Sequence, residues 1–296
     1  MIKINNLYIK FKDKEVLKGL NLNIPSNSVF GFIGKNGAGK TTTMKAILGL
    51  LIPDNGEIYV NNEKVIFGGV NTNKYIGYLP DVPEFYNFMT AYEFLSFCLE
   101  LSNINKDEIK PRIIEMLKLV GLENENHKIK GYSRGMKQRL GIAQALLNKP
   151  KLLICDEPTS ALDPIGRKQI LDILKEVSKE TTVLFSTHIL SDVEKICSDV
   201  AVLDEGEIKL VGKIEDIKSL YKKDEYVLEI EKEEDINLLL NTFSFINKKE
   251  DNKLYFYAVD NNLYEVLDFI SKNKLLINKI EKNEPTLESL FMEVTK

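Results

Sequence analysis

Residues 34–42 read Gly-Lys-Asn-Gly-Ala-Gly-Lys-Thr-Thr. This stretch fits the pattern G-x-x-x-x-G-K-[ST], in which glycines let the backbone turn tightly and point N–H groups at phosphate. An apolar run, Val29–Ile33, precedes it, and Thr42–Leu50 has the composition of a helix. This context predicts a nucleoside triphosphate site rather than a glycine turn before a core helix. The residues expected to bind the nucleotide are Gly34, Asn36, Gly37, Ala38, Gly39, Lys40, Thr41 and Thr42.

Charged and hydroxyl groups around this loop predict phosphate chemistry. Lys40 should reach the β- and γ-phosphates, and Thr41 should place its hydroxyl on Mg²⁺. A second apolar run, Lys151–Cys155, ends in two acids. At the carboxyl end of a parallel strand, Asp156 should hold Mg²⁺ directly or through water, and Glu157 should polarise a water for attack on the γ-phosphorus. Taken alone, this acidic pair is also compatible with a solvated strand end.

A third motif lies between these two strands. Residues 131–140 read GYSRGMKQRL, and Ser133 is a good N-cap for a helix that runs to about Leu147. The segment resembles the signature motif of ABC transporter ATPase subunits, in the form common in bacterial exporters of drugs and antibiotics. The resemblance implies that Ser133 and Gly135 close over the γ-phosphate of ATP on an opposite subunit. It implies as partners a homodimer or a heterodimer with a related ATPase subunit, and a separate transmembrane permease.

The same resemblance implies roles for three more residues. Asp163 matches the D-loop that crosses the dimer interface, and His188 matches the switch histidine that contacts the γ-phosphate beside Glu157. Phe11 matches the aromatic residue that stacks on adenine. The assignments of His188 and Phe11 each have a plainer alternative, because a solitary histidine is usually structural or merely exposed and an aromatic residue near a strand is more often core.

One position departs from the family pattern. Residues 77–80 read GYLP and resemble the Q-loop segment, in which Gln or Glu normally follows, but this chain has Asp81. The resemblance implies that Asp81 ligates Mg²⁺ or orients water with a side chain one methylene shorter. The alternative is that Asp81 caps a turn beside Pro80.

Composition is compatible with this interpretation. The 296 residues carry a formal net charge of −4, which argues against a nucleic-acid partner. Three cysteines without paired spacing fit a reducing cytosol, and no apolar run approaches the roughly 20 residues of a membrane span. With the family resemblance, we expect a cytoplasmic protein that is peripheral on the cytoplasmic face of the cell membrane.

The chain is expected to form an α/β P-loop NTPase of the ABC ATPase type, with an antiparallel β subdomain, a helical insert and a small α+β C-terminal domain. Residues 1–212 form the nucleotide-binding domain, with the insert at about 88–147, and residues 213–296 form the accessory domain. An aromatic group at residues 85–92 is either local core or a socket for a partner helix. Within 213–296, strands at 226–230, 243–247, 253–258 and 275–280 and helices at 236–241 and 263–271 suggest a ferredoxin-like sandwich.

These features favour an ATP-hydrolysing subunit that powers a membrane exporter through a separate transmembrane partner. The alternative is a soluble ABC-type ATPase that acts on ribosomes or DNA. Such proteins usually carry two fused nucleotide domains or a long coiled-coil arm, and this sequence has one such domain and no sustained heptads. A phosphate-loop kinase is a more distant third, because it would have no use for the signature motif.

Overall fold

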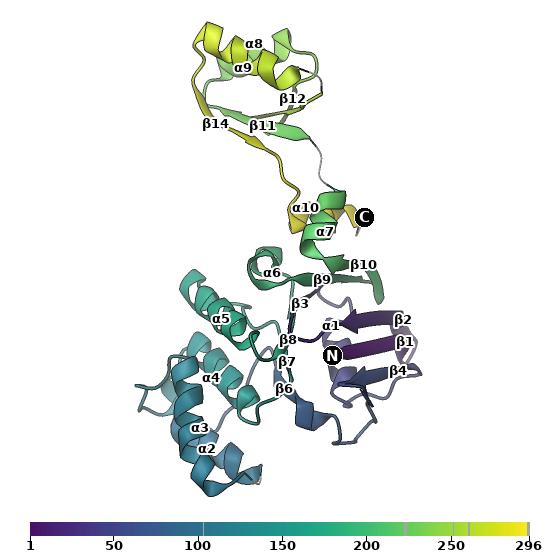
Figure 1. Ribbon diagram of the computed structural model, residues 1–296, viewed down its shortest axis with the longest axis vertical. Coiled ribbons are helices and arrows are strands. Elements are labelled where there is room, and N and C mark those ends of the chain that lie inside the picture. The colour runs from purple at the N-terminus through teal and green to yellow at the C-terminus, as the bar shows by residue number, and fades with distance from the viewer. Residues whose placement is uncertain (103, 222–223, 251, 260, 295–296) are drawn as a thin grey trace. The chain divides into compact units, whose positions relative to one another are not determined.

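The structure is a computed structural model, and it describes residues 1–102, 104–221, 224–250, 252–259 and 261–294. These residues divide into two compact units, one built on Met1–Ile214 and the other on Glu215–Glu293 (Figure 1). In these ranges, no helix combines the length and the apolar character needed to cross a membrane. All of the sequence motifs lie in the first unit.

A six-stranded sheet forms the centre of the first unit. Its strands are β3 (Val29–Ile33), β6 (Ile76–Leu79), β7 (Leu152–Asp156), β8 (Thr182–Thr187), β9 (Asp199–Asp204) and β10 (Glu207–Lys213). Their order is β10-β9-β3-β8-β7-β6, with parallel pairing from β9 to β6 and an antiparallel β10 at the edge. Every residue of β3, β7 and β8 is buried, as apolar strands covered on both faces require. The carboxyl ends of the parallel strands meet at one edge, where the phosphate loop and the acidic pair follow.

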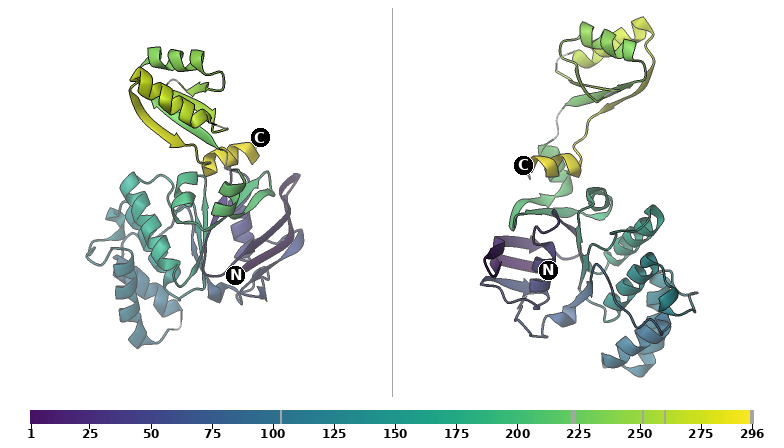
Figure 2. Two further views of the ribbon diagram at one scale, coloured as in Figure 1. Left: turned by 45° about the horizontal axis from the view of Figure 1, so that its top comes forward. Right: turned by 180° about the vertical axis from the view of Figure 1, so that it is seen from behind.

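Helices cover both faces of this sheet. The helices of this unit are α1 (Lys40–Ile47), α2 (Ala91–Leu101), α3 (Lys106–Leu119), α4 (Arg134–Leu146), α5 (Pro164–Val177) and α6 (Leu190–Ile196), with short 3₁₀ turns at Asn73–Tyr75 and Ile129–Gly131. Helices α4 and α5 lie on one side of the sheet, and α1 lies on the other (Figures 1 and 2). The phosphate loop therefore enters a helix that is packed against the core.

A second, antiparallel sheet packs over α1. It has the order β2-β1-β4-β5, formed by β1 (Ile2–Phe11), β2 (Lys14–Ile24), β4 (Asn55–Val60) and β5 (Glu63–Lys64). Buried and exposed residues alternate along much of β1, so one face points inward. Ile4 and Leu7 of that face share a core with Met44 of α1 and Phe32 of β3. This shared core fixes the loop between β3 and α1.

The helical insert is formed by α2, α3 and α4. Its first helix begins at a capping box, in which the Thr90 hydroxyl accepts from the backbone N–H of Glu93 at 3.2 Å and the Glu93 carboxylate accepts from the N–H of Thr90 at 2.7 Å. The ring of Phe94 then packs edge to face on Phe85, with centroids 5.1 Å apart. The insert places the signature helix α4 against β6 and α5.

From β11 to β14 the second unit has the order β-α-β-β-α-β that the sequence suggests. Its elements are α7 (Ile214–Leu220), β11 (Glu225–Ile230), α8 (Glu233–Thr242), β12 (Asn247–Glu250), β13 (Lys253–Tyr257), α9 (Asn262–Asn273), β14 (Ile277–Lys282) and α10 (Leu287–Val294). The four strands form an antiparallel sheet of order β12-β13-β11-β14, and buried residues such as Leu228, Leu254 and Val266 form a core of their own. This unit therefore has its own hydrophobic core.

One strand prediction in this unit is wrong in position. The sequence places a strand at 243–247, whereas β12 begins at Asn247. Residues 243–246 instead form a turn, with the Ile246 N–H bonded to the Phe243 carbonyl at 3.2 Å. The rings of Phe243 and Phe245 lie 5.2 Å apart and pack against the core. These two apolar residues are therefore explained by packing of a turn on the core, and not by a strand.

Candidate active site

The phosphate loop joins β3 to α1, and its glycines are required by close approach and backbone conformation. A Cβ on Gly34 would lie 2.5 Å from the carbonyl oxygen of Leu203. Gly39 has φ +114° and would bring a Cβ to 2.7 Å from Leu17. Gly39 is also the N-cap of α1, and no side chain caps this helix. The helix N-terminus is thus presented to the loop, an arrangement suited to binding an anion.

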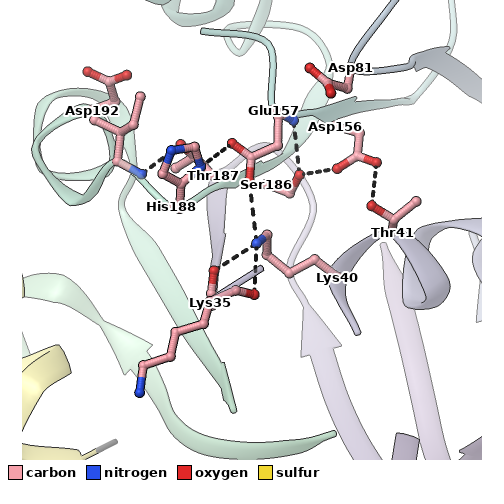
Figure 3. A network of polar contacts seen from close by, with 12 residues as sticks. Lys35, Lys40, Thr41, Asp81, Asp156, Glu157, Ser186, Thr187, His188 and Asp192 are labelled. Carbon is pink, nitrogen blue, oxygen red and sulfur yellow. Dashed lines mark hydrogen bonds and ion pairs between the residues drawn. The ribbon is translucent and has the colours of Figure 1, made fainter. Parts of the chain in front are cut away.

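Lys40 directs its ammonium group across the loop. The side chain is only 6% exposed, and its Nζ donates to the carbonyl of Gly34 at 2.7 Å and to that of Lys35 at 3.4 Å. The same Nζ lies 3.4 Å from Oε1 of Glu157 (Figure 3). One cation therefore joins the phosphate loop to the acid that follows β7.

Asp156 binds two hydroxyl groups at the end of β7. Its Oδ2 accepts from Oγ1 of Thr41 at 2.7 Å, and its Oδ1 accepts from Oγ of Ser186 at 2.6 Å. The carboxylate is 3% exposed, so these hydrogen bonds satisfy a buried charge. Burial, and then the nearby Asp156 charge, raise the pKa of Tyr78 to about 12, so this phenol stays protonated at neutral pH.

Glu157 has a strained backbone that turns its side chain toward a histidine. Its φ is +49°, a left-handed conformation that is uncommon outside glycine and clusters at functional sites. Two bonds from its N–H hold this conformation, one to the carbonyl and one to Oγ of Ser186, both at 3.1 Å. Its Oε2 lies 2.8 Å from Nδ1 of His188. Lys40, Thr41, Asp156, Glu157 and His188 thus form one polar network (Figure 3).

The signature and D-loop residues lie together in a separate hollow. Ser133 caps α4 by accepting from the N–H of Met136 at 3.2 Å, and Asp163 caps α5 by accepting from the N–H of Gly166 at 2.6 Å. Ser133, Gly135 and Asp163 all line one hollow of about 270 Å³. The described hydrogen bonds and ion pairs do not connect these three residues to the Lys40 network.

Phe11 ends β1, and its ring is 48% exposed. This exposure argues against the alternative that Phe11 is core. A large exposed ring offers a face for stacking.

The structure gives Asp81 contacts with α4. Its carboxylate lies 3.4 Å from the guanidinium of Arg134, with both side chains about half exposed. Its backbone carbonyl accepts from the side chain of Gln138 at 2.6 Å. In Figure 3 no dashed line joins Asp81 to Thr41 or Asp156.

Ser186 is a site residue that the sequence analysis did not single out. In the β7–β8 register it lies directly beside Asp156, and it bonds both to the Asp156 carboxylate and to the Glu157 backbone. Its position at the end of a buried strand, two residues before His188, is the signal that could have indicated it.

The fold, the phosphate loop and the signature helix together define an ATP-binding cassette, and the chain belongs to the ABC transporter family of ATP-binding proteins. Residues 17–160 match the family described as ABC transporter, and residues 212–295 match the ATP-binding protein DrrA1-3-like C-terminal domain. The chain is therefore an ATPase of the kind that powers a membrane transporter.

Relatives share nearly its whole length. The uncharacterized ABC transporter ATP-binding protein YxlF of Bacillus subtilis is 39% identical over 99% of both chains. The bacitracin transport ATP-binding protein BcrA of Enterococcus faecalis is 32% identical over 99% of this chain and 96% of its own. The second of these relatives is named for bacitracin transport, which is consistent with the drug and antibiotic export type.

Solved structures match the nucleotide-binding part. The cassette MJ0796, in a dimeric post-hydrolysis state with ADP and Pi, is 29% identical with a TM-score of 0.65 over 72% of this chain and 99% of its own. The cbiO1 protein of Clostridium perfringens, part of the ABC transporter complex cbiONQ, is 32% identical with a TM-score of 0.69 over 74% of this chain and 90% of its own. The P-loop ABC ATPase fold expected from the sequence is confirmed.

Proposed function

We propose that this ATPase drives export, and that a separate transmembrane permease forms the substrate path. The observation that carries the proposal is the continuous polar network from Lys40 through Glu157 to His188. It places a cation, an acid and a histidine beside the phosphate loop. These are the groups that ATP hydrolysis uses. The bacitracin transport relatives support a drug or antibiotic as the exported substrate.

In this proposal each residue of the network has a separate role in ATP hydrolysis. Backbone N–H groups of residues 34–42 hold the phosphates, and Lys40 leaves its loop carbonyls to bind the β- and γ-phosphates. Glu157 accepts a proton from the attacking water through its carboxylate, while the water oxygen bonds to the γ-phosphorus and ADP leaves. His188 holds the Glu157 carboxylate and contacts the γ-phosphate. The exposed ring of Phe11 stacks on adenine.

The residues present fit Mg²⁺. Thr41 and Asp156 supply hydroxyl and carboxylate oxygens 2.7 Å apart, which is the donor chemistry that Mg²⁺ prefers. Among the described residues, no cluster of three or more His, Cys, Asp or Glu side chains is placed to hold a metal by itself. When bound, the ion would neutralise phosphate charge. Asp81 remains a proposed outer ligand that would have to release Arg134.

We also infer that two copies, or this chain and a related one, build each complete site. Ser133, Gly135 and Asp163 face a hollow of their own, so they are available to nucleotide on an opposite subunit. Near the insert, Tyr86, Phe88 and Tyr92 are 41% to 68% exposed, and this aromatic surface is our proposed socket for the permease. The protein then acts at the cytoplasmic face of the membrane, without a nucleic-acid partner and with residues 213–296 as an accessory domain.

A detergent pull-down from the native cells tests this proposal. The tagged chain should bring down one polytopic membrane protein, and ATP should hydrolyse faster in that complex than with the chain alone. Capture of ribosomal or DNA-bound material without a membrane protein would overturn it.

A further inference from the structure

A buried carboxylate outside the polar network lacks ordinary partners. Asp192 is fully buried, and in the described part of the chain neither of its oxygens accepts a hydrogen bond. Asp192 forms an ion pair with Arg167, whose Nε lies 3.8 Å from Oδ2 and also makes no hydrogen bond among the described residues. A buried charge without hydrogen bonds is unfavourable, and an apolar side chain of similar size would avoid this cost.

The pair joins two segments that carry proposed site residues. Arg167 lies in the first turn of α5, where its backbone N–H donates to the carbonyl of Asp163 at 2.9 Å. Asp192 lies in the first turn of α6, four residues after His188. The two helices also pack on one another. The ion pair is thus a side-chain link between the D-loop helix and the helix that follows the histidine.

Asp192 does not act on substrate directly. Its carboxylate points away from the Glu157 and His188 pair in Figure 3, and the charge that faces it is that of Arg167. Its position therefore suits a residue that acts through the placement of another.

We propose that Arg167 and Asp192 are positioning residues for ATP hydrolysis. They hold the segment that carries His188 and the segment that carries Asp163 in a fixed position relative to each other. The inference rests on the proposed function. Without the pair, α5 and α6 would shift relative to each other, and His188 would lose its 2.8 Å contact with Glu157. ATP binding by the phosphate loop would be retained, because that loop is held by β3 and α1.

Three variants of the full chain distinguish a role of the ion pair in positioning His188 from a role in folding stability alone. Asp192→Asn removes the buried charge at constant shape. Arg167→Met with Asp192→Leu replaces the whole pair by apolar groups, which often restores or raises stability. Ile170→Val, in the buried face of α5, is the matched control for a small packing loss. For each, we would measure the melting temperature, the dissociation constant for ATP and kcat at a temperature well below melting.

The proposal expects Asp192→Asn and the apolar double variant each to lower kcat about tenfold or more, with ATP affinity within about twofold. The Ile170→Val control should keep kcat even where its melting temperature falls. Recovery of normal kcat in the double variant would show a merely structural pair and would overturn the proposal, as would normal kcat in Asp192→Asn. If unmodified protein binds ATP but never hydrolyses it, the proposed function fails instead.

Discussion

At the scale of single residues, the account depends on Lys40, whose ammonium group is bonded to loop carbonyls and faces Glu157. Lys40→Ala removes a charged donor aimed at phosphate, so ATP affinity should fall about tenfold or more. Lys45→Ala is the matched control, because it removes an exposed lysine charge from the last turn of α1, outside the loop. Equilibrium binding of a fluorescent ATP analogue measures both. Equal affinities in the two variants would remove Lys40 from the phosphate site.

Two alternative roles are proposed for Asp81, and variants of its ion-pair partner Arg134 distinguish between them. A half-exposed ion pair at 3.4 Å contributes about 1 kcal/mol or less to stability, so neither Asp81→Ala nor Arg134→Ala should change the melting temperature much. If Asp81 ligates Mg²⁺, Asp81→Ala alone should raise the Mg²⁺ concentration needed for half-maximal hydrolysis.

If Asp81 instead couples its loop to α4, both single variants should change the hydrolysis rate similarly, and the double variant should add little. We expect a larger change with the permease present than without it. Unchanged rates in all settings would leave Asp81 as a turn residue.

At the scale of elements, the N-terminus of α4 should contact ATP of a second chain. In a Glu157→Gln background with ATP, the chain should dimerise, and adding Ser133→Arg should prevent the dimer by placing bulk and charge near the γ-phosphate. Lys137→Arg, farther along the same helix, is a control that keeps the charge. Light scattering gives the masses. A dimer that survives Ser133→Arg would show that the two-chain site is wrong.

The sequence predicts these elements well where burial is continuous or a motif constrains the backbone. Val29–Ile33 and Leu152–Asp156 are uniformly buried strands, and the glycine pattern locates the loop between β3 and α1. The turn at 243–246 could not be separated from a strand, because its two phenylalanines are apolar for reasons of core packing.

Side-chain contacts between segments that are far apart in the sequence could not be predicted either. The ion pair of Asp81 with Arg134 joins the loop after β6 to α4, and that of Arg167 with Asp192 joins α5 to α6. No local sequence pattern marks either pair. The same holds for Ser186, which reaches Asp156 only through the register of two parallel strands. Local patterns therefore located the loop and the acidic residues of the candidate site better than the residues that bond to them.

At the scale of the whole molecule, the two units have separate cores. A chain that ends after Leu220 should keep ATP binding, because the described network lies within Met1–Ile214, but its ATP-dependent dimer lifetime or its transport activity should change. Binding assays and light scattering on the shortened and full chains test this. Complete loss of soluble protein would mean that residues beyond 220 complete the first core.

The central claim is that Glu157 is the base of an ATP-hydrolysing site, and single-turnover hydrolysis with Glu157→Gln tests it most directly. The amide keeps the size of the side chain but cannot accept the proton from water. We expect an ATP dissociation constant close to that of the unmodified chain and a hydrolysis rate lower by about a hundredfold or more. Near-normal hydrolysis by Glu157→Gln, with ATP bound, would contradict it.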